Sequence, residues 1–317
     1  MRNIRAAAVS AAPLAALPGA TPQETLDAMR RHWRDRLDTV LPDRPDIIVL
    51  PEHCDRPRGA TFEHDFYREY LELRGESTLE MLADVARRHR TTIAYPSHRQ
   101  DASGAWFNST QVIDRDGSVA GIYDKVFLTI GEHEINGLRH GREAVAVELD
   151  FGRVAPVICF DLNFEEFREQ VAALRPDLLL FSSAFHGGYL QEHWAYTIGA
   201  HMIASVYPPA VSGILSPTGE HVARTTNYRD EVVANINLDA RLIHIDHNHP
   251  KFADIKAAYG PRVRIHDPGL IGVVLLISDD DAVTADDVIA EFELEPVLDY
   301  FDRVRAHRDS VIARAST

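Results

Sequence analysis

The 317-residue chain carries 48 acidic and 33 basic side chains, and its formal net charge of −15 argues against nucleic acids and anionic membranes as partners. A hydrophobic content of 45% and a charged content of 26% are typical of a globular protein with a large core. The longest apolar run, Leu270–Ile277, is too short to span a membrane. The two cysteines, Cys54 and Cys159, give no disulfide framework and no metal-ligand spacing, so we expect a reducing cytoplasm.

The first half of the chain alternates helix and strand patterns. A capping box with proline at the first helical position predicts a helix over 21–41. The continuous apolar segment Asp46–Leu50 predicts a strand that is buried on both faces. This strand delivers Glu52 at its C-terminal end, where functional sites of α/β proteins gather. A predicted helix over 77–89 and a predicted strand over 91–95 follow.

A hairpin pattern comes next. The apolar segments Phe107–Ile113 and Val119–Tyr123 flank Asp114-Arg115-Asp116-Gly117, a turn sequence in which the glycine can take a positive φ. The second strand of this hairpin leads directly to Lys125, and a loop over 129–141 follows. Lys125 therefore stands at a strand end, as Glu52 does.

Cys159 ends another apolar strand, Val154–Ile158. Asp161 and Asn163 are placed to cap a following helix over 164–174. A thiol at such a junction faces the positive end of the helix, which lowers the thiol pKa and supplies backbone N–H groups for an oxyanion. Taken alone, the segment would fit a buried structural cysteine better.

The alternation continues with a buried strand over 178–181 and a predicted helix over 191–206. Helices and strands mixed with hairpins predict a layered α/β protein with a mixed sheet. We expect one main domain over 1–280 and a C-terminal helical extension over 281–317 that packs on the body or on a partner subunit.

Two features of the C-terminal part call for interpretation. The segment His244–His249 contains metal-ligand residue types, but sites on one short loop are uncommon, and a polar loop or a subunit contact is the preferred interpretation. A helix opened by Pro296 keeps one apolar face, which gains stability only when it is buried. The residues of that face are Val297, Phe301, Val304 and Val311.

Three strand ends thus present Glu52, Lys125 and Cys159. A carboxylate base, an ammonium group and a thiol nucleophile are the groups that a cysteine amidohydrolase needs. Their surroundings resemble the three signatures of the nitrilase, or carbon–nitrogen hydrolase, superfamily. These are a strand followed by Pro51-Glu52, the segment Tyr123-Asp124-Lys125-Val126-Phe127-Leu128, and the segment Gly152-Arg153-Val154-Ala155-Pro156-Val157-Ile158-Cys159-Phe160-Asp161-Leu162-Asn163-Phe164-Glu165. The resemblance covers residues 4–240.

The resemblance implies a four-layer αββα sandwich with two mixed β-sheets, a homodimer or higher homo-oligomer, and catalytic roles for the three residues. It also implies a second glutamate, and we assign Glu134 from its distance to His140-Gly141. Glu132 is the alternative, because the proline usual in that turn is missing. Pocket candidates come from the turn after the nucleophile and from the segment after the next strand, where core packing is the alternative. They are Phe160, Asn163, Phe185, His186, Tyr189 and Trp194.

The residues after Cys159 indicate which branch of the superfamily the chain resembles. Cys159-Phe160-Asp161 resembles the amidase, carbamoylase and ω-amidase branches, whereas true nitrilases carry Cys-Trp-Glu. Asn163 stands where those branches often carry arginine, which weakens a carbamoylase interpretation. We therefore expect hydrolysis of a small-molecule amide through a cysteine thioester, releasing ammonia or an amine, without a metal or organic cofactor. The alternatives are an N-carbamoyl amino acid (ureido) hydrolase, a nitrilase, a ligase-associated glutaminase domain and a non-catalytic binding member.

Overall fold

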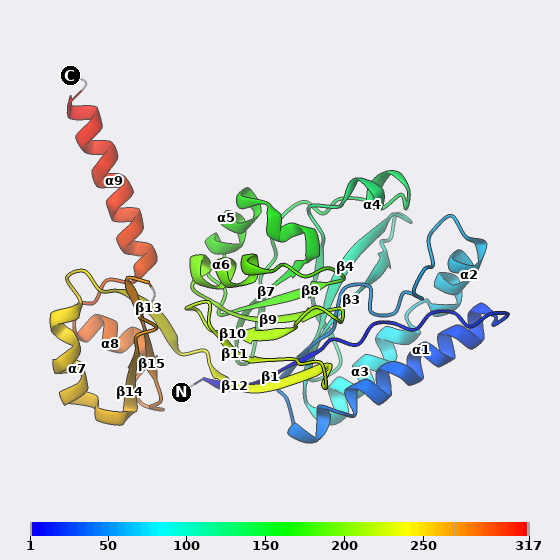
Figure 1. The fold of residues 1–317 in the computed structure, drawn as a ribbon, viewed down its shortest axis with the longest axis horizontal. Helices are drawn as coiled ribbons and strands as arrows, with labels where there is room; N and C mark the ends of the chain where they lie inside the picture. Colours follow the sequence, from blue (N-terminus) through cyan, green and yellow to red (C-terminus); the bar gives the residue numbers. More distant parts are fainter. Residues whose placement is uncertain (1, 270, 316–317) are drawn as a thin grey trace. The chain divides into compact units, whose positions relative to one another are not determined.

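The computed structural model describes residues 2–269 and 271–315, which form three β-sheets and their surrounding helices (Figure 1). The chain divides into two compact units. The larger is Ile4–Ile236, and the smaller comprises Met1–Asn3 and Asn237–Thr317. The division therefore falls before residue 237, whereas the sequence analysis placed it after residue 280.

The larger unit is built on two six-stranded mixed sheets, as far as the described residues go. The first has the order β12-β1-β2-β3-β4-β5, formed by Glu231–Asn237, Asn3–Val9, Ile47–Val49, Thr92–Gln100, Trp106–Ile113 and Val119–Asp124. The second has the order β11-β10-β9-β8-β7-β6, formed by His221–Arg224, Gly213–Leu215, His201–Val206, Leu178–Ser183, Gly152–Ile158 and Val147–Leu149. Each sheet contains three parallel strands, β1, β2 and β3 in the first and β7, β8 and β9 in the second. Strand β4 is antiparallel to β3 in the first sheet, and β6 and β10 are antiparallel to β7 and β9 in the second.

Helices cover the outer faces of both sheets, which confirms the predicted αββα sandwich (Figure 1). Helices α1 (Pro22–Leu37) and α3 (Ser77–His89) bury Trp33 and Leu82 against the first sheet. Helices α5 (Glu165–Ala173) and α6 (Tyr189–Ile198) pack on the second sheet in the same way. The inner faces of the sheets meet, because Ser182 Oγ donates a hydrogen bond to Leu50 O at 2.8 Å.

Two further helices complete the larger unit. Helix α2 (Asp65–Arg74) follows the loop after β2 and packs against α1. The five-residue helix α4 (Ile130–Glu134) lies in the loop after β5, between Lys125 and β6. This helix fixes the loop in which the second glutamate was expected.

The helix predicted over 191–206 is wrong in its second half. Helix α6 ends at Ile198, where Gly199 takes a left-handed conformation with φ of 75°. The residues that follow form the central strand β9 instead. Glycine stops a helix in this way because it adopts positive φ at little cost.

The predicted helix over 164–174 is present as α5, but its caps are not the predicted ones. The residue before its first turn is Phe164, and no side chain caps the helix. Asp161 and Asn163 instead belong to the short 3-10 turn Cys159–Asn163. The tight turn inserted between β7 and α5 is what removes them from the helix end.

The smaller unit contains a three-stranded antiparallel sheet of order β13-β15-β14, formed by Ala240–His244, Val273–Ser278 and Val263–His266. Helices α7 (Phe252–Tyr259) and α8 (Ala285–Glu291) share its core, to which Ile243, Leu276 and Val288 contribute. Residues before 280 therefore pack with those after it, which explains the position of the division. Leu270, where the longest apolar run starts, lies outside the described residues.

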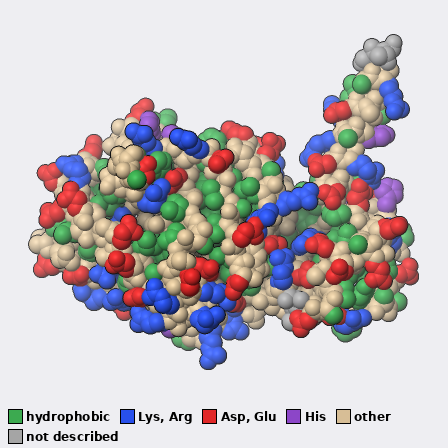
Figure 2. Space-filling view, turned by 180° about the vertical axis from the view of Figure 1, so that it is seen from behind, with side chains coloured by type: hydrophobic (Ala, Val, Ile, Leu, Met, Phe, Trp, Pro, Cys, Tyr) green, Lys and Arg blue, Asp and Glu red, His purple; other side chains and the backbone are tan. Residues whose placement is uncertain are grey.

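Helix α9 (Val297–Ala315) continues from this core, but only its start is buried there. The side chain of Tyr300 stacks on His244 and donates a hydrogen bond to Asp246, so the histidine-rich loop contacts this helix. From residue 302 onward α9 is exposed, and Val304 and Val311 keep 44% and 48% of their surface. Figure 2 shows hydrophobic side chains among charges of both signs along this helix. No helix among the described residues has the length and apolar character needed to cross a membrane.

Candidate active site

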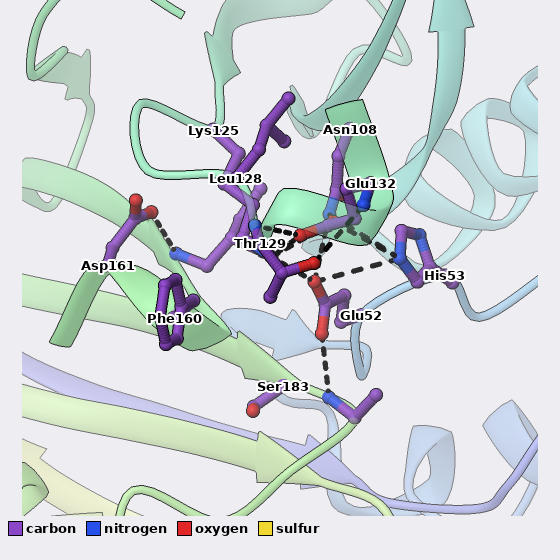
Figure 3. Close-up of polar contacts among 12 residues, drawn as sticks. Glu52, His53, Asn108, Lys125, Leu128, Thr129, Glu132, Phe160, Asp161 and Ser183 are labelled. Carbon is purple, nitrogen blue, oxygen red and sulfur yellow. Dashed lines mark hydrogen bonds and ion pairs between the residues drawn. The ribbon is translucent and has the colours of Figure 1, made fainter. Parts of the chain in front are cut away.

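The structure brings the three predicted residues together at one end of the sandwich. Glu52 follows β2, Lys125 follows β5 and Cys159 follows β7. Figure 3 shows the carboxylate of Glu52 among the polar contacts that join it to the ends of neighbouring strands and to Glu132. A contact between the sheets accounts for the meeting of β2 and β7. Ser182, which pairs with Ile158 at the end of β7, donates a hydrogen bond to the oxygen of Leu50 just after β2.

Glu52 is a buried carboxylate with three hydrogen-bond donors. Its Oε1 accepts bonds from Lys125 Nζ at 2.9 Å and Asn108 Nδ2 at 2.8 Å, and its Oε2 accepts one from the N–H of Ala184 at 2.9 Å. Burial raises the pKa of Glu52, but the positive charge of Lys125, followed by that of His53 and the hydrogen bonds, outweighs this and lowers the pKa to about 2. Glu52 is therefore ionised at neutral pH and can accept a proton.

Lys125 lies between two carboxylates. Besides Glu52, its Nζ donates to both oxygens of Glu132, at 3.0 and 2.9 Å. Burial of the ammonium group lowers the pKa of Lys125, but the charges of Glu52 and Glu132 outweigh burial and raise it above its usual value. Asn108 Nδ2 joins the same two glutamates by donating to each of them. The lysine is thus charged and held in position from two sides.

The glutamate beside Lys125 is Glu132, so the assignment to Glu134 is wrong. Glu134 is exposed, whereas Glu132 closes a capping box with Thr129 that opens α4. In this box the N–H of Thr129 donates to Glu132 Oε2 at 2.8 Å, and the N–H of Glu132 donates to Thr129 Oγ1 at 3.2 Å. The sequence contained the capping-box pattern of Thr129 and Glu132, which was the better guide to the position of the second glutamate. The spacing to His140-Gly141, on which the assignment of Glu134 was based, was the weaker guide.

Cys159 has a positive φ of 48° and starts the short turn after β7. Few non-glycine residues adopt this conformation. The charges of Glu52 and Lys125 both act on the Cys159 thiol, so the three side chains lie near one another. Burial and the charge of Glu52 raise the pKa of the Cys159 thiol to about 12, against the opposite effects of Lys125 and of a hydrogen bond with Ser183. The prediction of a lowered thiol pKa was wrong, because burial and the neighbouring carboxylate dominate over the start of the helix.

Asp161 joins the thiol-bearing turn to the Lys125 segment, a role that the sequence analysis missed. Its Oδ2 accepts bonds from the Tyr123 hydroxyl at 2.6 Å and the N–H of Ile158 at 2.9 Å. Its Oδ1 accepts one from the N–H of Phe127 at 3.0 Å. Burial raises the pKa of Asp161 to about 6 despite these donors. Aspartate two residues after the cysteine was the available signal, but it was read as a helix cap.

Glu52, His53 and Glu132 also place metal-ligand atoms within 4.8 Å of one another. His53 is buried, and its Nε2 lies 3.7 Å from Glu52 Oε1 and 3.9 Å from Glu132 Oε1. The ammonium of Lys125, however, already lies 2.9 Å from both carboxylates. The ammonium group supplies the positive charge that a metal ion would bring, so the arrangement favours Lys125 over a bound metal ion between these carboxylates.

The predicted pocket residues fall into two groups. Phe185, His186 and Tyr189 line an open groove of about 790 Å³. Trp194 does not, because it is 1% exposed and its Nε1 donates to Leu162 O in the core. The core-packing alternative was therefore correct for this residue, which belongs to the inner face of α6.

The two candidates in the turn after Cys159 lie outside the lining of this groove. Asn163 is exposed and donates from Nδ2 to Phe160 O at 2.9 Å, which stabilises the turn. Phe160 is 37% exposed and packs edge-to-face on Phe164. Its backbone N–H immediately follows the thiol-bearing residue, so its position still suits oxyanion binding.

The chain is similar to several known proteins. A family model described as carbon–nitrogen hydrolase matches residues 5–239. The omega-amidase NIT2 of Homo sapiens is 26% identical over 223 residues, which cover 66% of this chain and 79% of that protein. The omega-amidase NIT2 of Danio rerio is 24% identical over the same shares of both chains. Among solved structures, an amidase from Nesterenkonia sp. has a TM-score of 0.61 at 16% identity and covers 81% of this chain and 96% of its own.

The pKa of Cys159 predicts the pH dependence of its alkylation. With a thiol pKa of about 12, the rate with iodoacetamide should rise about tenfold per pH unit from pH 8 to 10 without levelling off. Glu52→Gln removes the negative charge that raises this pKa, so alkylation at pH 9 should become faster. Peptide mass spectrometry separates the product from Cys54, which is buried.

The matched control is Glu134→Gln, which removes an exposed carboxylate and should leave the alkylation profile unchanged. A wild-type rate that levels off below pH 9 would contradict the high thiol pKa. A thiolate absorbance at about 240 nm that rises over the same pH range in Glu52→Gln and in the wild type would show that Glu52 does not raise that pKa.

Proposed function

We propose, for a chain that belongs to the carbon–nitrogen hydrolase family, that Cys159 cleaves the C–N bond of a small amide through a thioester intermediate. The chain is an amidase-type hydrolase, as its matched relatives are. The observation that carries the proposal is the buried cluster in which Lys125 Nζ lies 2.9 Å from Glu52 and the charges of both residues act on the thiol of Cys159.

In the first step Glu52 accepts the thiol proton while the sulfur attacks the carbonyl carbon of the amide. The pKa values, about 12 for the thiol and about 2 for Glu52, make a free thiolate rare in the resting site. Proton transfer therefore accompanies formation of the carbon–sulfur bond rather than preceding it. Glu52 suits this role because its carboxylate is fixed by three donors.

Protonation of Glu52 in this step frees the ammonium group of Lys125 to bind the substrate. Once Glu52 is protonated, its attraction for the ammonium falls, and Lys125 Nζ can donate to the oxyanion that forms on the substrate. Glu132 still holds the ammonium in position through both carboxylate oxygens. The N–H of Phe160 is the second donor, and each such donor contributes roughly 10²–10³-fold in rate.

Collapse of the tetrahedral intermediate breaks the C–N bond, and Glu52 returns its proton to the leaving nitrogen. Ammonia or an amine departs and leaves an acyl thioester on Cys159. Glu52 then takes a proton from a water molecule, which attacks the thioester and releases the acid and the thiol. The net reaction consumes one water for each amide, and its steps use only side chains and backbone of this chain.

A substrate panel tests the reaction class. We expect valeramide to be hydrolysed with a kcat/KM at least about tenfold above valeronitrile, because the cluster is built to protonate a leaving amine. The same margin is expected over N-carbamoylalanine, because Asn163 stands where an arginine would pair with its carboxylate. Cys159→Ala should abolish turnover and serves as the control for contaminating activity. Faster hydrolysis of the nitrile or of the carbamoyl compound would identify one of the alternative branches.

Glu132 and Glu134 form a matched pair for the second glutamate. Glu132→Gln should lower kcat/KM for amides by about 10²-fold, because Lys125 loses the charge that holds it when Glu52 becomes protonated. Glu134→Gln should stay within about twofold of the wild type, since this side chain is exposed. Equal effects of the two substitutions would refute the role of Glu132.

We also propose that the protein is a homo-oligomer in which α9 contributes to a subunit contact. Within its own unit α9 leaves Val304 and Val311 exposed, and a second copy would bury such a face. Light scattering should give a mass of at least two chains for the full protein. Val304→Asp with Val311→Asp should reduce that mass, whereas Arg305→Asp is the matched control. A monomeric wild type would exclude the oligomer, and an unchanged mass in the double variant would exclude the role of α9.

A further inference from the structure

The groove lined by Phe185 and Tyr189 opens directly beside Glu52. Ala184, whose N–H donates to Glu52 Oε2 at 2.9 Å, is part of its wall. Tyr207 also lines the groove and donates from its hydroxyl to the backbone oxygen of Glu52. With a volume of about 790 Å³, the groove has the size of a small-molecule site. A group held in the groove would lie next to Ala184 and Tyr207, the two lining residues that contact Glu52.

Aromatic and apolar side chains dominate the exposed surface of this groove. Phe185 is 70% exposed and Tyr189 is 76% exposed, although rings of this size are usually more buried. Phe185 stacks on His186 with ring centroids 5.0 Å apart, which makes a flat wall. Val211, 46% exposed, adds an aliphatic surface. Exposed apolar groups gathered in one concave site indicate a ligand that covers them.

The charge of the groove excludes one class of ligand. Among the described residues that line it, Glu192 is the charged side chain, and neither lysine nor arginine occurs. Burial and the charge of Arg224 lower the pKa of His221, and together they outweigh the opposite effect of Glu192. The imidazole is therefore mainly uncharged at pH 7. Lys125, the nearby catalytic cation, is already held by two carboxylates. A carboxylate in the groove would meet the carboxylate of Glu192, and no lysine or arginine among the described lining residues would pair with it.

We propose that the groove binds the acyl group of the substrate and selects an uncharged aromatic or apolar group over one that ends in a carboxylate. This inference rests on the proposed function, because the acyl group is the part of an amide that stays on Cys159. It distinguishes the substrate of this chain from the monoamide of a dicarboxylic acid. Phe185 and Tyr189 are then specificity residues, and Glu192 is the group that repels an anionic acyl chain.

Binding to the Cys159→Ala protein tests the preference without turnover. Isothermal titration calorimetry would compare 3-phenylpropionamide, valeramide and glutaramate, the monoamide of glutaric acid. We expect 3-phenylpropionamide to bind at least about tenfold more tightly than glutaramate, with valeramide between them. Glutaramate binding as tightly as 3-phenylpropionamide, or more tightly, would overturn the proposal.

Substitutions in the groove identify the residues responsible. In the Cys159→Ala background, Phe185→Ala and Tyr189→Ala should each weaken 3-phenylpropionamide binding by about fivefold. Tyr228→Ala is the matched control, because Tyr228 is 89% exposed and does not line the groove. Glu192→Gln should strengthen glutaramate binding about two- to fivefold and leave valeramide unchanged. Unchanged affinities in all three groove variants would place the acyl group elsewhere.

Steady-state kinetics of the wild type separate this inference from the proposed function. If the amides bind with the expected order but none is hydrolysed, the proposed reaction fails and the groove assignment stands. If amides are hydrolysed with glutaramate preferred, the reaction stands and the groove assignment fails.

Discussion

The structure of the candidate site depends on one buried ammonium group held between two carboxylates. Lys125 lies 2.9 Å from oxygens of both Glu52 and Glu132, in a site where few water molecules can screen these charges. Breaking such a cluster by removing one partner leaves an uncompensated charge, so the three residues fix one another. The cluster as drawn carries one more negative than positive charge, which suits a site that must accept a proton. Figure 3 shows how closely the surrounding donors enclose it.

The fold supplies this cluster from segments far apart in the chain. Two facing sheets bring the ends of β2 and β7 together, and the hairpin of β4 and β5 adds Asn108 and Lys125. Asp161 ties the turn after β7 to the segment after β5 through three hydrogen bonds. None of these groups needs a long flexible loop, and the reacting atoms are therefore placed by strands and short turns. Such placement keeps the cost of orienting the reacting groups low.

Local patterns in the sequence predicted a layered α/β protein with a mixed sheet and placed Glu52, Lys125 and Cys159 at strand ends. The sandwich and the meeting of the three residues were implied by the resemblance to the family signatures around them. The sequence was insufficient for properties that depend on contacts between residues distant in the chain, such as the thiol pKa and the burial of a side chain. The thiol pKa follows from burial and the charge of Glu52, which is distant in sequence, and the helix-end argument gave the opposite direction. Glu132 was available from its capping box, but a spacing argument from the family favoured Glu134. Trp194 had the aromatic character of a pocket residue, and only the packing of α6 shows that it faces the core.

The limits of the larger unit illustrate the same point. The apolar run Leu270–Ile277 was included in the main domain over 1–280, since its hydrophobic pattern carries no information about which segment it packs against. In the structure its residues from Val273 onward belong to β15, paired with β13 and β14 in a separate sheet. Pairing partners are set by tertiary packing, which the periodicity of a single strand does not encode.

The account rests on Cys159 as the atom to which the acyl group is transferred. The most direct measurement is mass spectrometry of the protein quenched in acid during turnover of 3-phenylpropionamide, followed by peptide mapping. The account predicts a mass increase equal to one acyl group, located on the peptide that contains Cys159 and absent from Cys159→Ala. An acyl group on Cys54, or sustained turnover by Cys159→Ala, would contradict it.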